Sequence, residues 1–237
     1  MATPMQGTRT TTMSTDPLGW LRLMQLVSPA LPVGAFTYSQ GLEWAVEAGW
    51  VRDPATLQDW LGGLMEDGLL QLELPILQRL HHACAHADQQ KIAEWGQILY
   101  ASRETRELRA EERNRARALI TLLIDLGVER AEAWREILGQ CQAAPFALAA
   151  VHWRIASDDC ALGYAWSWLE NQVAAAIKLV PLGQTDGQRV QLQLAGRLPD
   201  IVERARDLAD DDIGAGAPAL AIASACHETQ YTRLFRS

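Results

Sequence analysis

One stretch, RETRELRAEERNRARALITLLIDLG (residues 103–127), decides the fold class. Leucines recur at helical spacing along it, at Leu108, Leu119 and Leu123. Gly127 is typical of a helix end, because glycine adopts the left-handed backbone conformation without strain. The stretch therefore predicts a long amphipathic helix that begins after Ser102 and ends near Leu126.

The same stretch carries arginines along its other side. At about 100° per residue, five arginines fall within about 120° of one helix face, opposite the leucines. We call them the arginine stripe: Arg103, Arg106, Arg109, Arg113 and Arg117. In an acidic protein, such a stripe indicates docking to an acidic partner surface. The alternatives are an exposed solubilising face with acidic partners in the same chain, and a nucleic-acid site, which the overall charge and the lack of a binding motif disfavour.

Helix signals continue outward on both sides of this stretch. Asp53 before Pro54, and also Asp88, are typical N-terminal caps. Val190–Leu194 alternates apolar and polar residues as a strand does, but no other segment repeats the pattern to pair with it, so we assign it to a helix. We expect an all-α, single-domain bundle of about ten helices with short connections and no internal repeat.

The two ends of the chain differ from this bundle. Residues 1–15 are polar and threonine-rich, which predicts a disordered lead-in before a domain over 16–229. Residues 230–237 form a C-terminal tail that combines Arg233 and Arg236 with apolar side chains. Because Tyr231, Leu234 and Phe235 are costly to leave in water, we expect the tail to fold back on the bundle or to become ordered on a partner. The tail and the arginine stripe together favour an interaction protein over an enzyme.

Composition excludes several classes of protein. The chain has 237 residues, 49% of them hydrophobic, and a formal net charge of -8, which argues against a general nucleic-acid binder. Its 4 cysteines are dispersed, which argues against a disulfide scaffold and suits a reducing cytoplasm. We find no apolar run long enough for a membrane span and no secretory signal, so we expect a cytoplasmic protein.

Two clusters are candidates for metal chemistry. His82 and His86 stand four residues apart beside His81 and Cys84, so both imidazoles can face one metal ion on a helix. An ordinary helix surface with histidines is the alternative. Asp210–Asp212 is an acidic run that suits a cation or diphosphate site less well than a solvated loop. No phosphate loop, nucleophile elbow or dinucleotide motif is present.

Four segments together have a familiar pattern. They are LPVGAFTYSQGLE (residues 31–43), SRETREL (102–108), KLVPLGQ (178–184) and YTRLFRS (231–237). In this order and at this spacing they resemble the UreF family of urease accessory proteins, along nearly all of residues 18–237. One departure lies in the long helix, where Arg115-Ala116-Arg117 replaces a step expected to resemble Met-Gly-Arg.

The resemblance implies an all-α, homodimeric, cytoplasmic chaperone for nickel insertion and urease maturation, with neither catalytic activity nor a cofactor of its own. The implied partners are UreD (also called UreH), apo-urease and the GTPase UreG, whose GTPase cycle the chaperone modulates. By resemblance, the tail Tyr231–Ser237 contacts UreD and Lys178 lies on the surface that faces UreG. A nickel-binding metallochaperone that uses the His81–His86 cluster remains the alternative.

Overall fold

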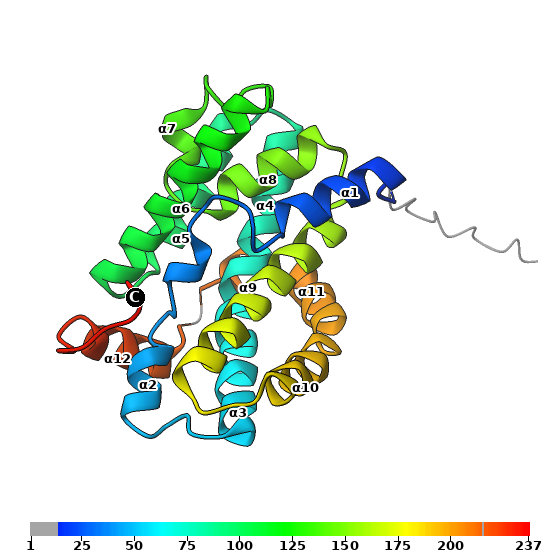
Figure 1. Ribbon diagram of the computed structural model, residues 1–237. Coiled ribbons are helices and arrows are strands. Elements are labelled where there is room, and N and C mark those ends of the chain that lie inside the picture. The colour runs from blue at the N-terminus through cyan, green and yellow to red at the C-terminus, as the bar shows by residue number, and fades with distance from the viewer. Residues whose placement is uncertain (1–13, 215) are drawn as a thin grey trace, which may run out of the picture.

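The structure is a computed structural model that describes residues 14–214 and 216–237 (Figure 1). Within these ranges the chain forms helices and no strand, which confirms the predicted fold class. The α-helices of the first half are α1 (Pro17–Leu26), α2 (Leu42–Glu47), α3 (Pro54–Leu64), α4 (Leu74–Ala85), α5 (Gln89–Ala101) and α6 (Arg106–Asp125). Those of the second half are α7 (Arg135–Leu138), α8 (Ala143–His152), α9 (Ser157–Leu179), α10 (Gln184–Ala195), α11 (Leu198–Asp207) and α12 (Pro218–His227).

Helix α4 lies at the centre of the bundle and packs against α5, α8 and α9 (Figure 1). Its first residues form a nearly continuous apolar run, and Leu74, Leu77 and Leu80 are fully buried. Helix α8 can pack closely against α4 because five of its ten residues are alanines, so the two backbones approach each other. This packing fixes one end of α9, which then crosses the molecule toward the C-terminus (Figure 1).

The structure differs from the sequence prediction between α3 and α4. The sequence predicts one helix that begins at Pro54 and a separate helix that begins at Pro75, but a π-helical segment, η2 (Met65–Glu73), joins the two without a break. In a π-helix, each backbone N–H donates to the carbonyl five residues earlier instead of four. The Leu74 N–H still donates to the Leu69 carbonyl, five residues earlier, so Pro75, which has no N–H, lies where the π-helical pattern ends. Elsewhere the Val190–Leu194 assignment is confirmed, since that segment lies within α10.

The N-terminal residues are described only from Ser14 onward, so residues 1–13 of the expected lead-in lie outside the described part. Thr15 is buried, and its Oγ1 accepts the Ala156 N–H at 2.9 Å and donates to Asp159. This contact holds the start of the chain against the first turn of α9. In the described residues, no helix combines the length and the hydropathy that crossing a bilayer requires.

Candidate interaction site around the C-terminus

The tail Tyr231–Ser237 lies against the chain's own bundle. The Arg236 N–H donates to the Thr37 carbonyl at 2.8 Å, and both the N–H and Oγ of Ser39 donate to the Ser237 carbonyl at 2.7 Å. Phe235 is buried, with 6% of its surface exposed, and Lys178 Nζ lies 5.7 Å from the centre of its ring. Of the two expectations for the tail, folding back describes this structure.

Glu43, in the first turn of α2, holds the tail backbone. Its Oε1 accepts the Leu234 N–H at 2.6 Å and its Oε2 accepts the Phe235 N–H at 2.9 Å. The carboxylate is buried and sits at a helix N-terminus, where the helix dipole favours a negative charge. These charge-assisted hydrogen bonds fix the path of the chain just before its end.

His227 of α12 connects Glu43 to a second carboxylate. Its ring is fully buried, with Nδ1 2.7 Å from Glu107 Oε2 and Nε2 3.1 Å from Glu43 Oε2. A neutral imidazole has one N–H and can donate to only one of these carboxylates, whereas a doubly protonated ring donates to both. Arg233 Nη1 donates to Glu107 Oε1 at 2.6 Å, so this group joins α2, α6, α12 and the tail.

A deeper carboxylate receives the end of the chain. Ser237 Oγ donates to Glu111 Oε2 at 3.0 Å, while Arg115 Nη1 and Gln40 Nε2 donate to Glu111 Oε1 at 2.8 and 3.0 Å. Burial raises the pKa of Glu111, although the Arg115 guanidinium opposes this shift. The last residue of the chain is thus tied to the middle of α6.

Arg103 corrects the prediction for the arginine stripe. Helix α6 begins at Arg106, after the cap Thr105, so Arg103 does not continue its face, and only 6% of its surface is exposed. Its guanidinium Nη2 lies 2.6 Å from Glu112 Oε1 and 3.0 Å from Glu73 Oε1. Burial alone would lower the pKa of Arg103, but these two carboxylates raise it above its usual value. Arg103 is an internal counter-charge and not a surface residue.

The rest of the stripe lies at or near the surface. Arg106, Arg113 and Arg117 are exposed, whereas Arg109 is half-buried and donates to the Arg103 carbonyl. The Arg113 guanidinium stacks 4.2 Å from the Tyr100 ring centre. With Arg135 of α7, two stripe residues line a groove between α6 and α7.

Part of the tail points into solvent. Tyr231 is fully exposed and Leu234 is 65% exposed, although their neighbour Phe235 is buried. We call these two side chains, with the exposed Arg236 and Lys178, the tail surface. It combines apolar and basic groups on a backbone that the glutamates hold in place.

The metal candidates are not brought together into a site. The His82 and His86 rings lie 4.2 Å apart, but His86 Nδ1 contacts the His82 carbonyl. His81 turns inward to the Ile155 carbonyl at 2.9 Å, and burial lowers the pKa of this histidine. Asp210, in the short turn η3 (Asp210–Asp212), pairs with Arg79 of α4. In the described part of the chain, no three His, Cys, Asp or Glu side chains gather as metal ligands.

We expect Gly41→Ala to destabilise the protein by about 2 kcal/mol. Gly41 has φ of 77°, and a Cβ there would lie 2.9 Å from the backbone nitrogen of Ser224, where α2 meets α12. The shift of the urea-unfolding midpoint measures the effect. Gly63→Ala is the control, because open space surrounds Gly63 inside α3 and alanine there reduces the entropy of the unfolded chain. Equal effects of the two changes would contradict this account of the α2–α12 contact.

All four segments that carry the family resemblance meet around the C-terminus. Residues 31–43 supply Ser39 and Glu43, residues 102–108 supply Glu107, and residues 178–184 supply Lys178 beside the tail itself. These segments are far apart in sequence, so their convergence indicates one shared site.

Comparison with known proteins shows which family the chain resembles. The UreF family model matches residues 51–195. A protein from Alcanivorax borkumensis called urease accessory protein UreF is 50% identical over 225 residues, covering 92% of this chain and 98% of the relative. Proteins of the same name from Pseudomonas putida (strain W619) and Chromohalobacter salexigens are each 51% identical, covering 93% and 94% of this chain and 98% and 96% of the relatives. The chain belongs to the UreF family of urease accessory proteins.

Proposed function

We propose that the chain is a non-catalytic scaffold for urease maturation that acts in the cytoplasm as a homodimer. It bridges a UreD (UreH) partner on apo-urease to the GTPase UreG and modulates the GTPase cycle, while nickel passes within the assembly. The observation that carries this proposal is the tail, whose backbone is held by buried carboxylates while Tyr231 and Leu234 project outward.

A tail ordered in advance suits partner binding. Association loses affinity when a flexible segment must be ordered at the same time, so a fixed backbone reduces that entropic cost. Tyrosine and arginine are enriched among the residues that dominate binding energy, and the tail surface presents both. We therefore assign the tail side chains Tyr231, Leu234 and Arg236 to the UreD partner.

The basic residues suggest how a second partner binds. Lys178 contacts the buried Phe235 ring with its ammonium group, so the residue assigned to UreG and the tail assigned to UreD are adjacent. Binding of UreG at Lys178 can therefore alter binding of UreD at the tail, because the contact between Lys178 and Phe235 connects the two. The groove with Arg113, Arg117 and Arg135 suits acidic side chains of a partner, since guanidinium groups bind carboxylates in a bidentate manner.

Co-purification tests this proposal. Removing the whole tail would also uncover Glu43 and Glu111, so we favour the exposed pair Tyr231→Ala with Leu234→Asp. The unchanged protein is expected to retain UreD, UreG and apo-urease, and the paired variant to lose UreD while unfolding at the same urea concentration. Leu192→Asp on α10 is the control, because Leu192 is 77% exposed and α10 lies on the opposite side of the bundle from the tail in Figure 1. Equal retention of UreD by the variant and the control would overturn the assignment of the tail surface.

A nickel-binding metallochaperone is the second candidate function, favoured by His82 and His86, whose ring centres lie 4.2 Å apart. Imidazole nitrogen is a good ligand for nickel, and the two residues are one helical turn apart. Calorimetric titration of the purified protein with nickel distinguishes the two functions. Stoichiometric binding that the His82→Ala/His86→Ala variant loses would support the metallochaperone, and its absence would leave the scaffold.

A further inference from the structure

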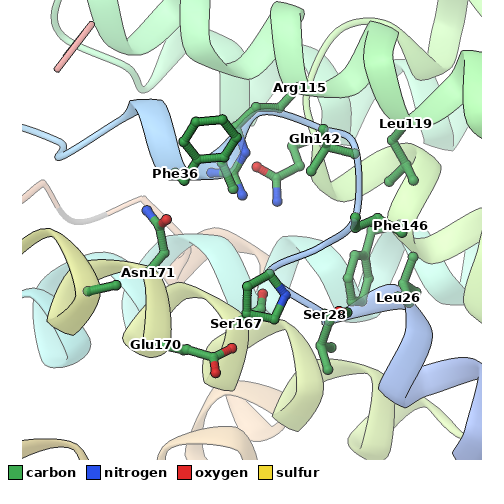
Figure 2. Close-up of a pocket in the computed structure, with 16 residues that line it drawn as sticks. Leu26, Ser28, Phe36, Arg115, Leu119, Gln142, Phe146, Ser167, Glu170 and Asn171 are labelled. Atoms are coloured by element: carbon green, nitrogen blue, oxygen red, sulfur yellow. The ribbon is translucent and has the colours of Figure 1, made fainter.

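A small pocket lies between the loop that follows α1 and the helices α6, α8 and α9 (Figure 2). Its volume is about 110 Å³. One wall is apolar and includes Leu26, Leu119 and Phe146, whose side chains gather on one side in Figure 2. An apolar cavity of about 150 Å³ in another protein holds benzene, so this space suits a single ring or a branched aliphatic group.

The opposite wall of the cavity is polar and contains a hydrogen-bond donor without an acceptor. Arg115 is 8% exposed, and its Nη1 donates to Glu111, but its buried Nε has no partner among the described atoms of the chain. Figure 2 shows the head groups of Arg115 and Gln142 pointing into the same space. Since a buried N–H is costly without an acceptor, the cavity is complementary to a group that supplies an oxygen there.

The charged side chains behind this wall determine whether a charged or a neutral oxygen acceptor is favoured in the cavity. Two arginines, Arg103 and Arg115, are buried with three glutamates, Glu73, Glu111 and Glu112. This cluster already holds more carboxylates than guanidinium groups. Glu170 lines the cavity as well, and burial raises the pKa of its carboxyl group. A further carboxylate is therefore disfavoured, and a neutral carbonyl oxygen is favoured.

We propose that this cavity binds a small neutral organic molecule that has one aromatic or branched aliphatic group and one carbonyl oxygen. The apolar group fills the space beside Leu119 and Phe146, and the carbonyl accepts the Arg115 Nε–H. The pocket adjoins the tail surface, because Ala174 lines it and Lys178 lies one turn further along α9.

The test uses three probes that share a ring and differ in the acceptor: benzamide, benzoate and toluene. Nuclear magnetic resonance of the full-length ¹⁵N-labelled protein follows the arginine Nε–H signals, with Arg115→Lys identifying the relevant one. We expect benzamide to move the Arg115 signal saturably and to bind at least tenfold more tightly than benzoate. Toluene is expected to leave the Arg115 signal in place, since it has no oxygen.

A second variant keeps the test valid if Arg115→Lys does not fold. Ala174 is an exposed residue of α9 that lines the cavity, so Ala174→Trp is expected to block it and abolish the benzamide shift. Ala133→Trp, at an exposed position outside the cavity, is the matched control and should retain the shift. No saturable shift with benzamide, an unchanged shift in Ala174→Trp, or tighter binding of benzoate would each overturn the proposal.

Discussion

Replacing Arg103 with methionine is expected to lower the free energy of unfolding by about 3–5 kcal/mol. Methionine occupies a similar volume but leaves Glu73 and Glu112 facing each other in the interior without the guanidinium that now lies 3.0 and 2.6 Å from them. Tyr164 donates to Glu73 at 3.0 Å, and this single hydrogen bond cannot replace a buried positive charge. Against a typical total stability of about 5–15 kcal/mol, the loss is a large fraction.

Urea unfolding followed by tryptophan fluorescence measures this effect, since Trp168 belongs to the same buried region and donates to Gln40. Arg117→Met on the exposed face of α6 is the control and should change stability by less than about 0.5 kcal/mol. Adding Glu73→Gln and Glu112→Gln to the Arg103 variant should recover most of the loss, because it removes the unpaired charges. A loss equal to that of the control would mean that Arg103 is not an essential counter-charge.

The sequence predicted the fold well because the decisive signals are local. Asp53 and Asp88 each cap a helix through the side chain, with their carboxylates accepting N–H groups three residues on. Such caps act within one turn and need no knowledge of the remaining chain. The π-helical segment η2 was missed because no residue in it forbids an ordinary α-helix, and packing decides between the two.

The interaction site was only partly predictable. The residues of the site could be recognised within four segments of the sequence. The contacts between them, however, join residues as distant as Glu43 and His227, and no helical periodicity relates such residues. One signal was available in α6, where Glu111, Glu112 and Arg115 lie on the same face as the buried Leu108 and Leu119. Charged residues within an apolar stripe indicate a buried ionic network, because isolated charges do not enter a core. Arg103 was misplaced because its spacing continues the helix, whereas the chain bends at Thr105.

The second large effect is expected from Glu43→Ala, which removes the carboxylate that holds the tail. The Leu234 and Phe235 N–H groups and one nitrogen of His227 would then lack their acceptor, at a cost of about 2–4 kcal/mol to docking of the tail. The fraction of molecules with a free tail should rise about 30-fold or more. Trypsin followed by mass spectrometry measures this fraction, since cleavage after Arg233 removes residues 234–237 only when the tail is released.

Glu94→Ala provides the matched control, because Glu94 is exposed on α5 and pairs only with its neighbours Lys91 and Gln90. Cleavage of Glu43→Ala at the same rate as this control would show that the remaining contacts of Phe235, Arg236 and Ser237 retain the tail. The same variant also tests whether a partner recognises the docked tail. If the partner recognises the docked tail, the apparent affinity for UreD falls by the same factor as the population of molecules with a docked tail, because only those molecules can bind. If UreD instead binds a released tail, Glu43→Ala should bind it more tightly, because the bonds to Glu43 no longer compete with the partner.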